Sequence, residues 1–98
     1  MEKTNDTYFS AISAQLKNIM KLKNIEVSDL AAAANIDRKQ VYRVLNNENV
    51  PKITTLIRII IALDIEPKDF FNFEFDFKKY SDEQNIVKIK HKFVSNSE

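Results

Sequence analysis

The chain has 98 residues, 44% of them hydrophobic, with a net charge of +1, one histidine and no cysteine or glycine. This length suits one domain with a single small core, and zinc sites, disulfides and thiol catalysis lack the residues that they need. No apolar run approaches the roughly 20 residues of a membrane span, and the start lacks a signal-peptide pattern, so we expect a cytoplasmic protein.

Apolar residues at helical spacing predict an α-helix over residues 7–23, after a polar and disordered stretch over residues 1–6. Further helices are expected, in chain order, over about 27–34, 37–46, 53–63 and 67–71. Asn24, Asn35 and Asn47 follow the first three helices closely. Because the chain has no glycine, these asparagines are the residues expected to adopt the left-handed backbone conformation there.

The most informative stretch is residues 30–47, which read LAAAANIDRKQVYRVLNN. Small residues occupy the place where two helices would cross, a tight turn follows at Asn35, and cationic or amide side chains begin the second helix. Residues 38–58 contain five cations and one acid, whereas residues 64–98 contain eight acids and six lysines. A basic patch confined to such a unit indicates a helix-turn-helix that binds DNA.

The predicted helix over residues 53–63 is apolar nearly all round. The residues expected to face the bundle core are Ile53, Leu56, Ile60 and Leu63. Ile57, Ile59 and Ile61 remain on other faces. A helix of this kind is normally covered on more than one side, so we expect another segment or a second subunit to pack there.

The extension over residues 72–98 contains two alternating patterns that predict a β-hairpin. The first pattern consists of Phe71, Phe73, Phe75 and Phe77, and the second of Val87, Ile89, His91 and Phe93. Residues two apart share one face of a strand, so the hairpin would gather these side chains on one side. The loop is expected over residues 78–85, with acids opposite lysines on the wet face. An isolated hairpin is marginal in water, so its phenylalanine face is expected to pack on the fourth helix or a second subunit.

From about residue 12 to residue 71 the chain resembles the lambda-repressor-like family of helix-turn-helix DNA-binding domains, the Cro/repressor type. The pieces that carry the resemblance are LKNIMKLKNI, LAAAANID, RKQVYRVLNN and NVPKITTLIRIIIALDIEP. The resemblance implies an all-α, five-helix domain over residues 7–71 whose third helix reads DNA. In this family a phosphate-anchoring Gln usually opens the second helix, where this chain has Val27, and Lys52 replaces a frequent Ser.

By position in the family, four residues are expected to contact bases: Arg38, Lys39, Gln40 and Arg43. Arg and Lys pair with guanine edges and Gln with adenine, although Gln40 equally well faces the scaffold. Contacts to the DNA backbone are expected from Tyr42, Asn46, Asn47, Lys52 and Thr54. The alternative interpretation is that the charges are an ordinary solvated helix face and that the asparagines serve a turn.

We therefore expect a sequence-specific transcriptional regulator that binds double-stranded DNA as a homodimer, because one recognition helix reads too few bases. The residues expected at the dimer contact or under the tail are Ile57, Ile61, Phe71, Phe73, Phe75 and Phe77. The alternative function is an antitoxin or adaptor whose tail binds a protein partner. An enzyme is not expected, nor is a cofactor or metal, because the acid pairs at 74/76 and 82/83 and His91 lack supporting groups.

Overall fold

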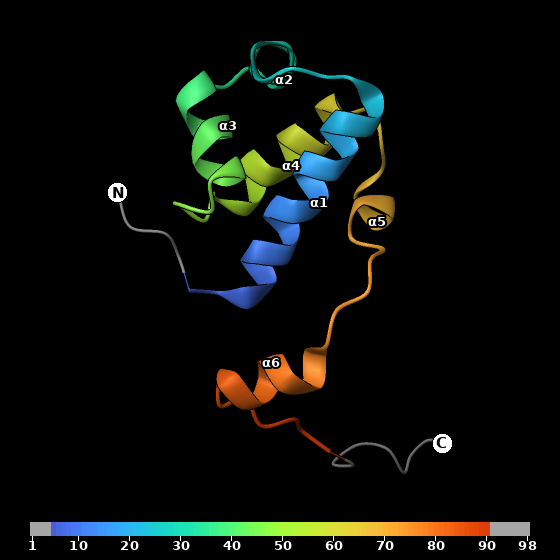
Figure 1. Cartoon of the computed structure of the whole chain (residues 1–98). Coiled ribbons are helices and arrows are strands. Elements are labelled where there is room, and N and C mark those ends of the chain that lie inside the picture. The colour runs from blue at the N-terminus through green and yellow to red at the C-terminus, as the bar shows by residue number, and fades with distance from the viewer. Residues whose placement is uncertain (1–4, 91–98) are drawn as a thin grey trace.

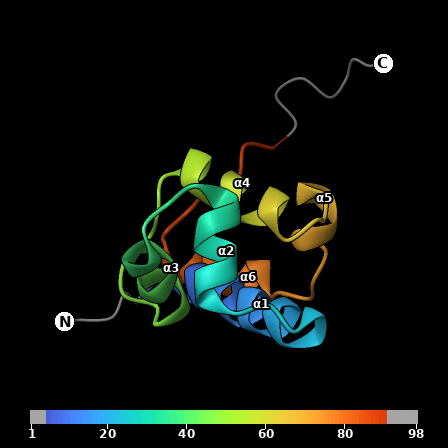
Figure 2. The ribbon, with the colours of Figure 1, turned by 90° about the horizontal axis from the view of Figure 1, so that it is seen from above.

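Six α-helices make up the regular structure of residues 5–90, which are the residues that the computed structural model describes (Figure 1). The helices are α1 (Thr7–Lys23), α2 (Val27–Ala34), α3 (Arg38–Leu45), α4 (Ile53–Ala62), α5 (Pro67–Phe70) and α6 (Phe77–Glu83). Seen from above, α2 crosses the bundle with α3 on one side and α5 on the other (Figure 2). The prediction of a mainly α fold is confirmed, and α1 to α5 follow the predicted bounds closely.

Left-handed residues change the chain direction after five of the helices. Asn24, Asn35 and Asn47 have φ angles of 56°, 58° and 58°, which confirms their predicted conformation. Asp64 after α4, at 62°, and Asn85 after α6, at 57°, do the same. Asparagine and aspartate tolerate this region better than other residues with a Cβ atom, so they replace the glycines that the chain lacks.

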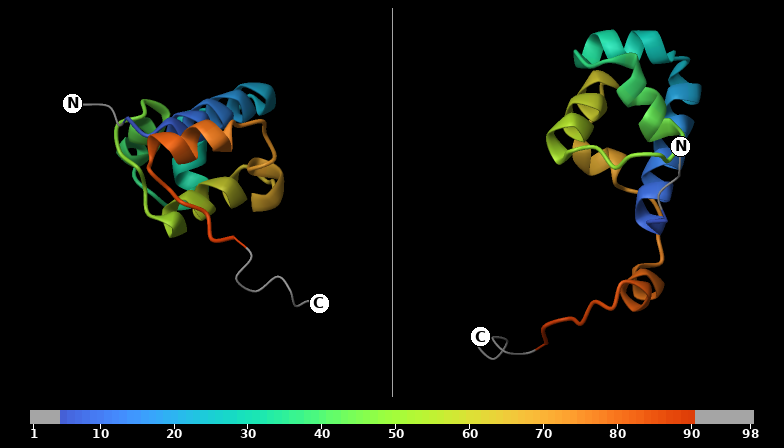
Figure 3. Two further views of the ribbon diagram at one scale, coloured as in Figure 1. Left: turned by 90° about the horizontal axis from the view of Figure 1, so that it is seen from below. Right: turned by 90° about the vertical axis from the view of Figure 1, so that its left-hand side faces the viewer.

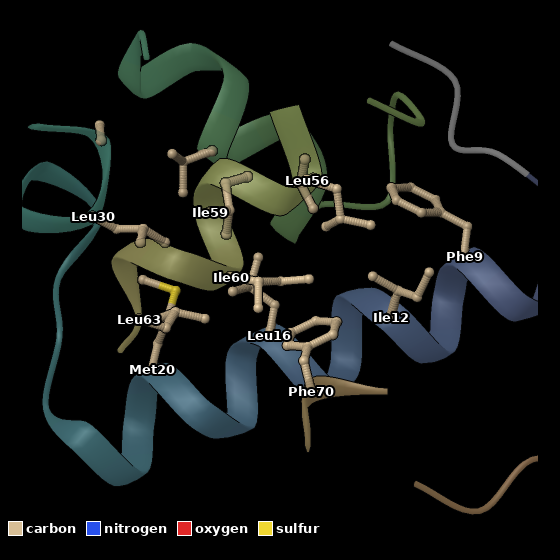
Figure 4. Close-up of a cluster of buried hydrophobic side chains, with 13 residues drawn as sticks. Phe9, Ile12, Leu16, Met20, Leu30, Leu56, Ile59, Ile60, Leu63 and Phe70 are labelled. Carbon is tan, nitrogen blue, oxygen red and sulfur yellow. The ribbon is translucent and has the colours of Figure 1, made fainter. Parts of the chain in front are cut away.

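The core lies between α1, α4 and the α2–α3 pair, and α5 closes it with Phe70 (Figure 4). The largest side chains that are fully buried are Leu16, Leu30, Val41, Val44, Ile59, Ile60, Leu63 and Phe70. The core face of α4 is Leu56, Ile59, Ile60 and Leu63, at spacings of i, i+3, i+4 and i+7. Two predictions for α4 were therefore wrong: Ile59 faces the core, and Ile53, at the first position of the helix, is 65% exposed.

The predicted β-hairpin is wrong for the described residues. Residues 72–76 form no strand, residues 78–83 belong to α6 rather than to a loop, and residues 86–90 pair with no strand in the described part of the chain. His91 and Phe93 lie outside the described residues. The carboxylate of Asp76 accepts a hydrogen bond from the Lys79 backbone N–H at 3.0 Å, and this N-cap starts a helix where alternation alone predicts a strand.

An aromatic cluster around Tyr8 explains where the alternating phenylalanines pack. The ring centroids of Phe73, Phe75 and Phe77 lie 5.9, 4.7 and 5.5 Å from that of Tyr8, near the start of α1. Phe71 instead packs against Phe70 at 5.1 Å. The rings at 73, 75 and 77 gather around this single ring of α1 without a partner strand, and Phe77 remains 55% exposed. The tail therefore packs on α1, so the prediction that it packs on the fourth helix was wrong, and the predicted alternative of a second subunit stays a prediction.

Two side-chain hydrogen bonds attach α6 to the start of α1, beneath the rest of the bundle (Figure 3). The Tyr80 hydroxyl donates to the Asp6 carboxylate at 2.7 Å, and the Thr7 hydroxyl donates to Glu83 at 3.3 Å. Burial raises the pKa of Asp6, but hydrogen bonds from the Phe9 N–H and from Tyr80 outweigh it and leave the pKa below 3.8. Donation to Asp6 raises the pKa of Tyr80 above 10.0.

Candidate nucleic-acid interface

The recognition helix α3 is held by its apolar side. Val41 and Val44 are buried against the core, while Ala31 and Ala34 of α2 are small enough to let the two helices cross closely. The carboxylate of Asp37 accepts a hydrogen bond at 2.9 Å from a backbone N–H in the first turn of α3, which fixes where the helix begins. The side of α3 that points away from the bundle is therefore set by the packing of two valines.

The outward side of α3 is cationic. At 100° per residue, Lys39 and Arg43 lie opposite the Val41 and Val44 side, and Arg38 lies on one flank. The exposed residues of this helix are Arg38, Lys39, Gln40 and Tyr42, and Arg43 is half-buried. Lys39 and Arg43 therefore lie on the side that faces away from the core, whereas Arg38 and Gln40 lie on opposite flanks of the helix, with Gln40 on the flank next to Val44.

A surface hollow joins α3 to the chain segment that leads into α4. Its polar lining includes Gln40, Arg43 and Lys52, so it brings together residues that were predicted separately as base and backbone contacts. Thr55 also lines this hollow. Thr54, which was the threonine predicted to contact the DNA backbone, is exposed but does not line the hollow. Both threonines follow Pro51 closely, and they differ only in the side of α4 on which each one lies.

The turn after α3 is tied to α1 rather than left open. The Asn46 N–H donates to a carbonyl of α3 at 2.8 Å, and the Asn47 side-chain amide donates to the Ser10 hydroxyl at 2.8 Å. The buried Ser13 hydroxyl donates to the Val44 carbonyl at 2.6 Å. The predicted contact residue Asn47 therefore holds the end of α3 against α1, whereas Asn46 closes the last turn of α3 itself.

The first turn of α2 carries acidic side chains. The Glu26 N–H donates to the Asp29 carboxylate at 3.3 Å, as in a capping box, and Val27 packs against the core. Two carboxylates at this helix start repel a phosphate group, and Val27 offers it no hydrogen bond. Lys52, ahead of α4, is an exposed cation that lines the same hollow as Arg43 of α3.

Other kinds of site lack support in residues 5–90. No group of three histidine, cysteine, aspartate or glutamate side chains is placed there to hold a metal ion. No helix in the same range has the length and apolar character needed to cross a bilayer. The surface of α3 and its adjoining hollow is therefore the candidate site.

A family model described as Cro/C1-type HTH DNA-binding domain matches residues 15–76, which is more than half of the chain. The chain belongs to this family. The match confirms the resemblance inferred from the sequence, and the matched range includes all of α2 and α3. It ends just before α6, so α6 and its contacts with α1 lie beyond the matched residues. No significant match was found among curated proteins or among solved structures.

Proposed function

We propose that this Cro/C1-type protein is a sequence-specific transcriptional regulator that inserts α3 into the major groove of duplex DNA. The observation that carries the proposal is the cationic side of α3, opposite the buried valines. An eight-residue helix is about 12 Å long, which suits a major groove about 12 Å wide. Occupancy of an operator then changes access to the promoter.

The roles of the contacting residues follow from their positions on α3 and on the loop beside it. Arg38, Lys39, Gln40 and Arg43 read base edges, where a bidentate pair discriminates by about 1–3 kcal/mol. Lys52 and Thr54 contact phosphates, together with Tyr42 on the flank of α3 and the turn at Asn46 and Asn47. The common hollow of Gln40, Arg43 and Lys52 supports this division, because it offers a base contact and a phosphate contact side by side.

We also propose that the regulator binds as a homodimer on a two-fold site. Dimers of this class read half-sites about 34–36 Å apart. Ile53, Ile57 and Ile61 recur every four residues on α4, and Ile61 is 62% exposed. Ile57 is half-buried against the core, and the exposed Ile53 and Ile61 on either side of it support a subunit contact on α4.

The test is selection of bound sequences from random duplex DNA, followed by binding measurements over a range of salt concentrations. We expect Arg43→Ala to lose preference at one base position by about 1–3 kcal/mol. Lys52→Ala should weaken binding to all sequences and reduce the salt slope by about 1, because one phosphate contact is lost. The matched control is Lys17→Ala, an exposed lysine on α1, which should leave both quantities unchanged.

Two results would contradict the proposal. The wild-type protein could show no preference among duplexes at moderate ionic strength. Alternatively, Arg43→Ala and Lys52→Ala could both retain the wild-type sequence preference and salt slope, in which case α3 and its loop are not the DNA-binding surface.

A further inference from the structure

Residues 86–90, here called the tail segment, follow α6 as an extended and exposed stretch (Figure 3). Val87 and Ile89 are 89% and 79% exposed, and they alternate with Lys88 and Lys90. Neither lysine has an ion-pair partner in the described part of the chain. The tail segment thus presents apolar and cationic side chains that nothing covers there.

A second surface of opposite charge lies where α4 gives way to α5. This α4–α5 hollow is lined by Ile61, Asp64, Ile65, Glu66, Pro67 and Asp69. Its apolar part is exposed at Ile61, and its carboxylates are exposed. Glu66 forms an ion pair with Lys68 at 3.8 Å, but both side chains are more than 70% exposed, so solvent screens this pair.

The two surfaces complement each other in both charge and polarity. Isoleucine and valine side chains of the tail segment match the apolar lining of the hollow, and Lys88 and Lys90 match its carboxylates. Pairing them would cover exposed apolar area and bring opposite charges together, which gives both attraction and specificity.

The attachment of α6 and the α4 end of the hollow lie near opposite ends of α1. Glu83 is attached to Thr7 at the start of α1, whereas Lys23 at the other end of α1 donates to the carbonyls of Leu63 and Asp64. These two ends of a 17-residue helix are about 24 Å apart, and Figure 1 shows α6 near the first and the end of α4 near the second.

The reach of the chain after α6 is shorter than this separation. Val87 follows Glu83 by four residues and extends at most about 14 Å from it, and Ile89 extends at most about 21 Å. The Ile86 N–H also donates to the Ser81 carbonyl at 2.9 Å, which keeps the start of the tail segment on α6. Val87 and Ile89 therefore fall short of the end of α4 in their own chain, so a second copy is the source from which they reach this hollow.

We propose that the tail segment of one copy of this protein docks in the α4–α5 hollow of a second copy. The inference rests on the homodimer of the proposed function and specifies how it is made. Because the two surfaces differ, a two-fold arrangement forms two identical contacts and leaves neither surface free, which closes the assembly at a dimer. The contact weakens as salt concentration rises, because exposed charges contribute to it.

A charge exchange tests this pairing by sedimentation without DNA. The tail-reversed variant carries Lys88→Glu and Lys90→Glu, and the hollow-reversed variant carries Glu66→Lys and Asp69→Lys. Each variant alone brings like charges together, so its dimer should dissociate at least about tenfold more readily than the wild type. In a mixture of the two, both contacts again join a basic to an acidic surface, so the mixed dimer should form with near wild-type stability.

The matched control is the double variant Lys17→Glu and Lys21→Glu, which makes the same charge change on exposed positions of α1. We expect it to dimerise like the wild type. Failure of the mixture to restore the dimer overturns the proposal, and so does equal loss of dimer in the control, because net charge and not the specific pairing would then explain the result.

Disulfide trapping supplies an independent test, since the chain has no cysteine of its own. A mixture of Val87→Cys chains and Ile61→Cys chains should form disulfides between unlike chains on mild oxidation. Bonds between two Ile61→Cys chains alone would instead indicate a symmetric contact through α4 and would overturn the tail docking. Crosslinks within one chain carrying both substitutions, with no dimer, would overturn the reach argument.

Failure of the docking is distinguishable from failure of DNA recognition. A wild-type protein that remains monomeric at tens of micromolar but selects a DNA sequence overturns the dimer contact and leaves the role of α3 intact. If the tail-reversed variant still dimerises but binds all duplexes more weakly, the tail segment binds phosphates instead, and the docking proposal is wrong.

Discussion

Replacing Ser13 with alanine should destabilise the protein through one identifiable contact. Ser13 is the buried polar side chain of the described residues, 3% exposed, and its hydroxyl donates to the Val44 carbonyl at 2.6 Å. This bond joins α1 to the end of the recognition helix across 31 residues of sequence. A net contribution of about 0.5–1.5 kcal/mol is typical of such a bond.

Two features of the structure limit the loss of stability expected for Ser13→Ala. The Val44 carbonyl also accepts the Asn47 N–H at 3.1 Å, so the substitution leaves it with one partner and avoids the larger cost of an unpaired buried group. Alanine also favours a helix over serine by about 0.5 kcal/mol, which offsets part of the loss. Ser28→Ala, on the exposed side of α2, gains the same helix preference without losing a buried bond.

The measurement is thermal unfolding of the two variants at one protein concentration, followed by circular dichroism. Ser13→Ala should be less stable than Ser28→Ala by about 1 kcal/mol, which for a domain of this size is about 4–8 °C in Tm. A Ser13→Ala protein that melts at or above the temperature of Ser28→Ala would refute the reasoning, because the buried bond would then contribute nothing to the native state.

Three further predictions concern packing, backbone conformation and pH. Leu16→Ala should lower the free energy of unfolding in urea by about 2–5 kcal/mol because Leu16 is fully buried, while Leu22→Ala, at a position 77% exposed, should change it by less than about 0.5 kcal/mol. Asn35→Ala should cost about 1 kcal/mol in thermal unfolding because φ is 58°, whereas Asn35→Gly should cost nothing; equal Tm values for the two would contradict this. The lowered pKa of Asp6 contributes stability that is present above pH 3.8 and is lost as pH falls through the pKa of Asp6 in the folded protein. The raised pKa of Tyr80 contributes stability that is present below pH 10.0 and is lost as pH rises through the pKa of Tyr80 in the folded protein. The Tm difference between wild type and Tyr80→Phe should therefore shrink at both extremes of pH, and a constant difference would argue against the Asp6–Tyr80 bond.

One part of the candidate site could be predicted from local sequence pattern, and another part depends on how the chain folds around it. The cationic residues of α3 could be predicted because helical spacing alone separates Val41 and Val44 from Lys39 and Arg43. The common hollow of Gln40, Arg43 and Lys52 could not, because the path of the chain between α3 and α4 determines it. The rotation of α4 about its axis likewise decides that Thr55, and not its neighbour Thr54, lines this hollow.

Residue order by itself determined the helices α1 to α5 and the turns after α1, α2 and α3, because caps, helical spacing and left-handed asparagines act within a few residues. Only the tertiary structure decided the arrangement after α5. Alternating phenylalanines at 73, 75 and 77 are equally compatible with a strand and with a cluster around one ring, and the choice depends on Tyr8, more than sixty residues earlier in the chain. A contact over such a separation leaves no periodic signal in the sequence. The surface against which these phenylalanines pack is therefore determined only when the helices come together.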